Sequence, residues 1–228
     1  MARRAAAEIL GTAFLLMAVV GSGIMGERLA AGNIAMALMA NAVATGAALV
    51  ALIMTFGPVS GAHFNPVVTL AFALRGGLSW HEATSYIVAQ ITGAFAGVAA
   101  AHLMFGLPLF FASTHVRNGS AQLWSEFVAT FGLLVVILAC VRSRPAAVPW
   151  AVGAYIAAAY WFTASTSFAN PALTVARAVS NTFSGIRPAD VPAFIAAQIA
   201  GALAAALLVP WLMPLNQAKS ATQQAPAI

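Results

Sequence analysis

Charged side chains are scarce in this sequence of 228 residues. Lysine and arginine together number 10, aspartate and glutamate number 5, and the charged share is 7%, against about a quarter in a typical soluble domain. Apolar residues make up 62% of the chain, and its mean hydropathy is +0.91. A soluble fold could not bury that much apolar surface, and a disordered chain would be more polar. The composition therefore predicts a polytopic membrane protein.

Cysteine is almost absent as well. The single Cys140 excludes an internal disulfide framework and a metal site built from cysteines. The sequence contains no His/Asp/Cys cluster with metal-ligand spacing and no pairing of a nucleophile with a base, so we expect no metal, no cofactor and no enzymatic activity. The pI of about 10.4 comes from few and scattered basic residues rather than a basic stripe, so no nucleic acid partner is expected.

Long segments without charge divide the chain into candidate spans. A spanning helix needs about 20 mostly apolar residues, and we expect six of them, near residues 8–27, 34–56, 83–104, 121–141, 147–167 and 191–213. The first span, after two arginines, is similar to a secretory signal peptide. Glu8 at its start, and the return of the same pattern in mid-chain, favour a retained helix over a cleaved signal.

Six spans place both termini on one side of the membrane. With the N-terminus in the cytoplasm, six basic residues lie inside and four outside, a weak bias that favours this orientation. The inside set is Arg3, Arg4, Arg75, Arg142, Arg144 and Lys219, and the outside set is Arg28, Arg117, Arg177 and Arg187.

Three motifs occur twice, in the same order and at similar separations. They are Glu-x-x-x-Thr-type, Asn-Pro and Ala-Gln-Ile-x-Gly motifs, at Glu8 and Glu126, Asn65 and Asn170, and Gln90 and Gln198. This indicates a duplication, with one repeat over about 5–105, a second over about 121–214, and a polar tail at 215–228. Because each repeat has three spans, the second enters from the opposite side, and such inverted repeats place a functional site near mid-membrane.

Two short apolar stretches, 65–75 and 170–180, each begin with Asn-Pro. At about 1.5 Å per residue they cover roughly 15 Å, half of an apolar core of about 30 Å. Asparagine is a good N-cap, and proline suits the first helical position, so both stretches predict half-helices. The preceding residues, 57–64 and 163–169, are small or polar, and we expect extended backbone there, along a water-filled path.

Inverted symmetry aims both half-helix N-termini at the membrane centre. Each N-terminus carries about half a positive charge, so the pair would repel cations and orient a passing water by its oxygen. The side-chain amides of Asn65 and Asn170 would donate hydrogen bonds there. One Asn-Pro alone is usually a plain turn; two copies in a duplicated chain favour a pore.

At these residues the sequence resembles the aquaporin (major intrinsic protein) family. The resemblance runs from Glu8 to about Pro214 and rests on the repeated Glu and Gln positions and on Ser60-Gly61-Ala62-His63-Phe64, Asn65-Pro66-Val67 and Asn170-Pro171-Ala172. It implies an all-α membrane protein of one channel domain, with six transmembrane helices and two re-entrant half-helices, assembled in the lipid bilayer as a homotetramer. It also implies passive transport of water and small neutral solutes.

Several buried polar residues have two interpretations. An ionised carboxylate at depth is costly unless its oxygens are satisfied, so Glu8 and Glu126 either relay protons or accept hydrogen bonds from the loops before the half-helices. Their symmetric placement favours the second. Gln90 and Gln198 are predicted to hydrogen-bond between helices. His63 resembles the loop histidine that faces the pore in this family, with a purely structural histidine as the alternative.

The constriction departs from the family pattern. The second motif usually reads Asn-Pro-Ala-Arg, and its arginine forms the cationic wall of the outer constriction, whereas this chain has Leu173 there. Spacing from the two motifs places the other constriction positions at Thr45, Ala158 and Ser167. All four residues are small or aliphatic, which implies a wide, uncharged constriction. Val67 replaces the usual alanine and is expected to add bulk beside the pore.

Arg177 follows Leu173 by one helical turn, on the same face. It either reaches back toward the pore mouth or caps the outer end of its half-helix. Leu-Thr-Val-Ala-Arg at this point resembles a bacterial subgroup that lacks the filter arginine and is linked to arsenic resistance. This implies arsenite, As(OH)3, as a solute, and a bacterial inner membrane with both termini cytoplasmic. The alternative from another class is an ion- or proton-coupled secondary transporter.

Overall fold

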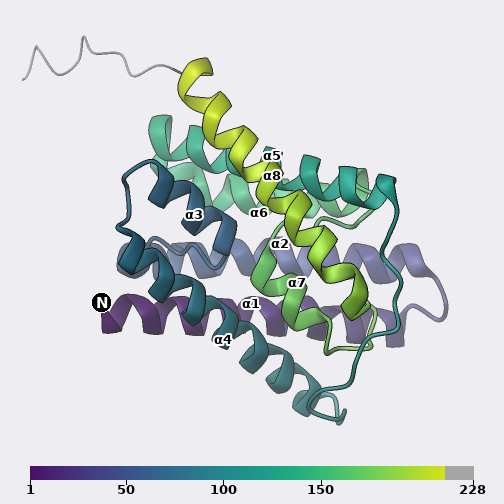
Figure 1. The fold of residues 1–228 in the computed structure, drawn as a ribbon. Coiled ribbons are helices and arrows are strands. Elements are labelled where there is room, and N and C mark those ends of the chain that lie inside the picture. The colour runs from purple at the N-terminus through teal and green to yellow at the C-terminus, as the bar shows by residue number, and fades with distance from the viewer. Residues whose placement is uncertain (214–228) are drawn as a thin grey trace, which may run out of the picture.

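Long α-helices surround two short ones in the computed structural model, which describes residues 1–213 (Figure 1). Apart from one isolated bridge between Phe111 and Ser180, no β-structure occurs in this part of the chain. The helices are α1 (Ala2–Leu29), α2 (Ile34–Ser60), α3 (Pro66–Leu74), α4 (Trp80–Met104), α5 (Ser120–Ser143), α6 (Val148–Phe162), α7 (Pro171–Arg177) and α8 (Val191–Leu212), with 3₁₀ turns at Pro145–Ala147 and Pro188–Asp190. The predicted polar tail, 215–228, lies outside the described residues.

Five helices in residues 1–213 are long and apolar enough to cross a membrane, namely α1, α2, α4, α5 and α8 together with its preceding turn. The predicted span 147–167 is shorter than expected, because α6 has 15 residues and ends at Phe162. At about 1.5 Å per residue it covers roughly 22 Å. Thr163 then adopts extended backbone, with ψ of 137°, and the chain continues as an irregular segment toward α7.

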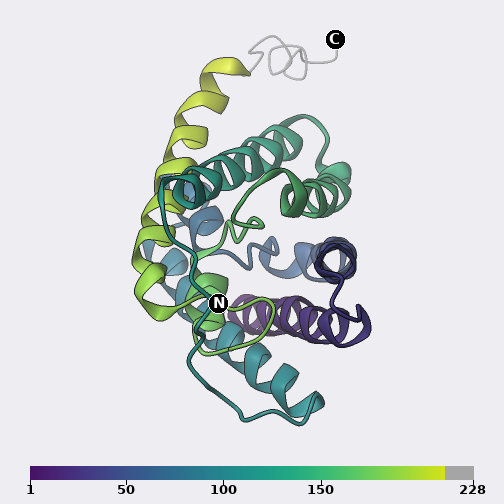
Figure 2. The same cartoon turned by 90° about the vertical axis from the view of Figure 1, so that its right-hand side faces the viewer.

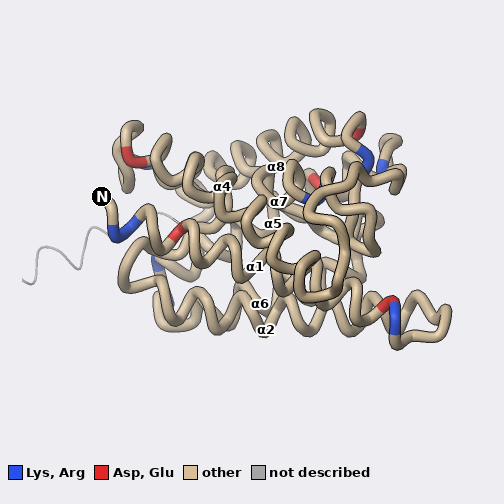
Figure 3. The backbone as a smooth tube through the Cα atoms, turned by 90° about the horizontal axis from the view of Figure 1, so that it is seen from below, with Lys and Arg blue, Asp and Glu red and all other residues tan. Residues whose placement is uncertain are grey.

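Charged residues lie mostly toward the two ends of the helices (Figure 3). Large apolar residues remain exposed on the helices between them, including Leu207 at 78% and Trp124 at 65% exposure. Such surface suits lipid tails rather than water. With the apolar helices, it makes the chain an integral membrane protein.

The packing of α1–α4 corresponds to that of α5–α8. In one half α1 packs on α2 and α4, in the other α5 packs on α6 and α8, and α2 crosses α6 between the halves. Figure 2 shows α1 and α2 in one half and α5 and α6 in the other, with irregular segments reaching between them. Each half-helix also contacts the opposite repeat, since α7 packs on α4 and α3 packs on α8.

Glycines set the distance between the halves. A Cβ on Gly46 of α2 would lie 2.8 Å from the carbonyl oxygen of Gly153 on α6, and a Cβ on Gly153 would lie 2.6 Å from the carbonyl oxygen of Gly46. Both distances are too short for any side chain, so the two helix backbones touch at this crossing. Within each half, glycines allow an equally close backbone contact, at Gly93 of α4 against α1 and at Gly201 of α8 against α5.

The two half-helices begin where the sequence predicts and end sooner. Pro66 and Pro171 are the first helical residues of α3 and α7, which have 9 and 7 residues. The stretch before α3 differs from the prediction, because α2 stays helical through Ser60 and only then gives way at Gly61, whose φ of 87° is left-handed. A glycine in that conformation is a common end for a helix.

Candidate pore and its constriction

Each half-helix is capped by its own asparagine. The Oδ1 atom of Asn65 accepts a hydrogen bond from the backbone N–H of Val67 at 3.1 Å. The Oδ1 atom of Asn170 accepts from the N–H groups of Ala172 at 3.0 Å and Leu173 at 3.3 Å. These caps satisfy N–H groups that a helix start otherwise leaves unpaired. Because the cap uses only the backbone N–H of residue 67, the valine found there instead of the usual alanine leaves the cap intact.

The same two asparagines also tie the repeats together. Nδ2 of Asn65 donates to the carbonyl oxygen of Ala169, and Nδ2 of Asn170 donates to the carbonyl oxygen of Phe64, both at 2.8 Å. Each carbonyl belongs to the residue just before the other asparagine. An amide nitrogen has two N–H groups, so each asparagine keeps a second donor, and both residues line the central cavity.

The segments before the half-helices hold unusual backbone conformations. Left-handed φ values between 48° and 59° occur at five non-glycine residues, Ala62, Phe64, Thr166, Ser167 and Ala169. Such a residue costs of order 1–3 kcal/mol and persists only where the surroundings impose it. These backbone conformations point the carbonyl groups of Phe64 and Ala169 toward the asparagine amides that donate to them.

Glu8 fixes the first of these segments. Its Oε1 accepts from the Ser60 hydroxyl at 2.6 Å and the His63 N–H at 3.0 Å, and its Oε2 accepts from the Phe64 N–H at 2.7 Å and from Gln90 Nε2 at 2.8 Å. The carboxylate is fully buried. Four donors around one carboxylate give both of its oxygens hydrogen-bond partners without a cation.

Glu126 does the same for the second segment. It accepts from the N–H groups of Phe168 and Ala169, both at 2.9 Å, and from Gln198 Nε2 at 2.6 Å. Gln198 also donates to the hydroxyl of Thr174 at 2.9 Å, as Gln90 does to the hydroxyl of Thr69. This geometry favours the structural interpretation of both glutamates over a proton relay, because their oxygens are already occupied.

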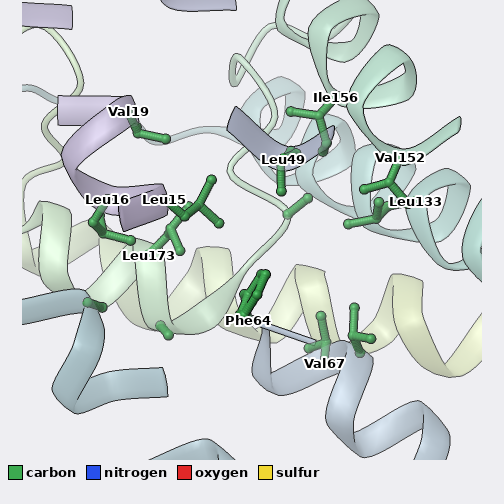
Figure 4. Packing of buried hydrophobic residues seen from close by; sticks show 14 of the residues in the cluster. Leu15, Leu16, Val19, Leu49, Phe64, Val67, Leu133, Val152, Ile156 and Leu173 are labelled. Carbon is green, nitrogen blue, oxygen red and sulfur yellow. The ribbon is translucent and has the colours of Figure 1, made fainter. Parts of the chain in front are cut away.

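A cavity of about 90 Å³ passes both asparagines. Apolar side chains from α1, α2, α5 and α6 form most of its wall, and Figure 4 shows several of them, including Leu15, Leu49, Leu133 and Ile156. Its polar lining residues are Thr45, His63, Asn65, Tyr160, Ser167, Asn170 and Arg177.

Three of the four predicted constriction residues, Thr45, Ser167 and Leu173, line this cavity, and the structure corrects the fourth. Ala158 lies on an exposed face of α6, whereas Ile156 and Tyr160 line the cavity. Residues two apart on a helix differ by about 200°, so Ala158 faces away from both of them.

Tyr160 is a residue of the constriction that the sequence did not predict. Its hydroxyl lies 3.2 Å from Oγ1 of Thr45. The hydroxyl of Ser167 is buried and has no hydrogen-bond partner among residues 1–213. The wall thus carries three hydroxyl groups beside apolar surface, and a bulky tyrosine where a small alanine was expected.

Two further site residues have positions that sharpen their roles. Val67 is 1% exposed and packs in the core, so it does not stand beside the cavity as expected; Val68 lines it instead. His63 lines the cavity and also contacts Oγ1 of Thr69 through Nδ1 at 3.1 Å, with its ring 4.8 Å from that of Phe72. His63 therefore lines the pore and makes structural contacts at the same time, so the two interpretations are compatible.

Arg177 is 2% exposed and sits in the wall of the cavity. Its Nε donates to the carbonyl oxygen of Ser184, and its guanidinium carbon lies 3.3 Å from the centre of the Phe168 ring. It also borders a second pocket of about 350 Å³ at the end of α7 away from Asn170, hereafter the outer pocket. Arg177 is the last residue of α7 and also lines the cavity, and its Nε donates to Ser184 rather than to a carbonyl of α7.

Half-helices that meet N-terminus to N-terminus inside a bundle of membrane helices, with a cavity passing both caps, define a membrane channel. The chain matches the family model described as major intrinsic protein over residues 1–148 and 141–227. It is 59% identical over 192 residues to aquaglyceroporin AqpS of Rhizobium meliloti (strain 1021), covering 84% of this chain and 82% of that protein. The chain therefore belongs to the major intrinsic protein family, as its motifs indicated.

Other relatives agree with this assignment. Aquaporin NIP1-4 of Oryza sativa subsp. japonica is 41% identical over 137 residues, which cover 58% of this chain and 48% of that protein. The X-ray structure of the aquaglyceroporin from Plasmodium falciparum superposes with a TM-score of 0.74 at 20% identity, covering 94% of this chain and 98% of that one. That likeness establishes the fold, and the predicted fold class is confirmed.

Proposed function

We propose that this channel conducts water and small uncharged solutes of the polyol type, with glycerol as the reference solute. The observation that carries the proposal is the mixed wall of the cavity. The hydroxyl groups of Thr45, Tyr160 and Ser167 offer hydrogen bonds to a solute, while Leu173 and Ile156 offer apolar surface to its carbon atoms. Pore diameter and lining groups of this kind set selectivity in such channels.

Transport is passive in this proposal. A coupled transporter needs ion ligands near mid-membrane, and the carboxylates at that depth, Glu8 and Glu126, are saturated by backbone and amide donors. Within residues 1–213 no group of three or more His, Cys, Asp or Glu side chains is placed to hold a metal ion. Flux should therefore follow the solute gradient and should not respond to an imposed pH or sodium gradient.

The charge pattern and the family support the setting that we propose. In this proposal the channel lies in a bacterial inner membrane, with both termini in the cytoplasm and the C-terminal end of α7 facing outward. It acts as a homotetramer with one pore per subunit. Arsenite is a candidate solute because As(OH)3 is uncharged at neutral pH and carries three hydroxyl groups.

Stopped-flow light scattering on proteoliposomes tests the proposal. Water, glycerol and arsenite should each permeate faster than through protein-free vesicles. The variant Leu173→Arg should lower glycerol flux more than water flux, because a long cationic side chain then enters the cavity. Leu173→Met is the matched control, since it conserves volume. Glycerol flux equal to that of empty vesicles would refute the proposed function, and unchanged flux in Leu173→Arg would refute the place of Leu173 in the constriction.

A further inference from the structure

A second arginine, half-buried and from outside both repeats, meets Arg177 at the same aromatic ring. Arg117 belongs to the segment between α4 and α5, and its guanidinium carbon lies 4.9 Å from the centre of the Phe168 ring. Its Nε donates to the carbonyl oxygen of Gly185 at 2.7 Å and its Nη1 to that of Ser165 at 3.2 Å. Arg117 and Arg177 both line the outer pocket.

The two repeats use equivalent positions for this ring contact and fill them differently. In the first repeat His63 stacks on Phe72, with ring centres 4.8 Å apart. The equivalent positions in the second repeat, counted from the two asparagines, hold Phe168 and Arg177, which stack at 3.3 Å. The geometry is shared, but only the second repeat places a cation there, so the duplicated scaffold does not require it.

The cations are also not needed to neutralise the buried carboxylate beside them. Glu126 accepts from two backbone N–H groups and Gln198. Its counterpart Glu8 is held by the same kinds of donor, with no arginine among its hydrogen-bond partners in residues 1–213. Two guanidinium groups thus stand near the single buried carboxylate Glu126. The nearby Asp190, whose Oδ2 accepts from the Arg117 N–H at 2.8 Å, is paired with Arg187, and the exposed Glu27 lies at the rim of the outer pocket.

Arg177 lines the pore and keeps donors that no residue within 1–213 accepts. Its Nε is engaged by Ser184, whereas its Nη groups donate to no residue within 1–213, and the side chain borders both the central cavity and the outer pocket. A cation on the shared wall of two cavities meets any solute that passes between them. Because Leu173 is uncharged, no other cation of α7 stands at this level.

We propose that Arg117 and Arg177, held on the Phe168 ring, form the cation barrier at the outer side of this pore. Neutral solutes pass this pair and can accept hydrogen bonds from it, while potassium and sodium ions are repelled. This inference rests on the proposed channel function. It adds Arg117, which belongs to neither repeat and to none of the motifs, to the residues that determine selectivity.

The test compares potassium and glycerol flux in the same proteoliposomes, made with wild type, Arg117→Gln, Arg177→Gln and the double variant. One unit charge at about 10 Å, with an effective dielectric constant of about 20, changes a rate on the order of tenfold. Each single variant should raise the ratio of potassium to glycerol flux by about that factor, and the double variant should raise it further. Arg117→Lys and Arg177→Lys keep the charge and should stay tight to potassium.

Arg28→Gln is the matched control, because Arg28 lies on the same side of the bundle and lines neither cavity. Gln variants that conduct glycerol but still exclude potassium would refute the proposed barrier and leave the proposed channel function intact. Absent glycerol flux in wild type would instead overturn the channel itself. Arg117→Met and Arg177→Met preserve the apolar stems, and failure of all four neutral variants to reconstitute would assign the pair to folding and overturn the barrier.

Discussion

The replacement Glu126→Gln separates a structural carboxylate from a proton relay. A glutamine offers one acceptor oxygen and one NH₂ group where the glutamate offers two acceptors. With its oxygen facing Ala169 and Gln198, its NH₂ group would face the N–H of Phe168 at a site where the two atoms are now 2.9 Å apart. One buried donor is then left unsatisfied.

The expected loss of stability follows from these bonds. Losing one charge-assisted hydrogen bond costs about 1.5–3 kcal/mol, and converting the other two to neutral bonds costs about 1 kcal/mol each. Relief from burying a charge returns part of this, and we expect a net destabilisation of roughly 3 kcal/mol. For a chain of this size that corresponds to a drop in Tm of roughly 6–12 °C. The backbone N–H of Phe168, next to the left-handed Ala169 with φ of 48°, would lose its acceptor.

Thermal unfolding in detergent, followed by the fluorescence of the 5 tryptophans, measures this shift, and glycerol flux is measured on the same preparation. Glu27→Gln is the control, because Glu27 is an exposed acid on α1 and its loss should leave Tm within a degree or two. A Glu126→Gln protein with wild-type Tm, but with flux that had lost a dependence on pH, would refute the structural interpretation and support the relay.

Further predictions concern the cavity wall and the helix crossing. Ser167→Ala should leave Tm unchanged, because the hydroxyl has no partner among residues 1–213. It should lower glycerol flux about two- to tenfold, which corresponds to the loss of one neutral hydrogen bond. Thr45→Val should also lower glycerol flux. Gly46→Ala should destabilise the protein by about 1–3 kcal/mol in a detergent melt, since the new Cβ lies 2.8 Å from the Gly153 carbonyl oxygen. Gly57→Ala on the same helix meets nothing within 4 Å and should be neutral or stabilising; equal effects of the two glycine changes would contradict close packing at the crossing.

The features that could be predicted from sequence are those that occur in both repeats. Asn65 and Asn170 announce half-helices because asparagine and proline have local reasons to start a helix, and the structure begins α3 and α7 there. Glu8 and Glu126 were predictable for another reason: a buried charge needs many donors, and an adjacent irregular loop has them to offer.

Features that depend on where one element meets another could not be predicted. The count that chose Ala158 treated the chain from α6 to α7 as having the family's usual length and course, but α6 ends at Phe162 and presents Tyr160 to the cavity. Which face of α2 and α6 is inward depends on the contact of Gly46 with Gly153. Neither glycine carries a local signal of that crossing.

The comparison of the two repeats separates scaffold from selectivity. Where the repeats agree, as in Glu8 and Glu126 or Gln90 and Gln198, the residues hold backbone that both half-helices need. Two equivalent positions at which they differ lie on the pore wall: a histidine and a phenylalanine on one side, a phenylalanine and Arg177 on the other. Inverted symmetry by itself would make the two halves of the pore alike for a passing solute. The departures from symmetry are therefore where selectivity can arise, and Arg117, which lies outside both repeats, adds to the largest of them.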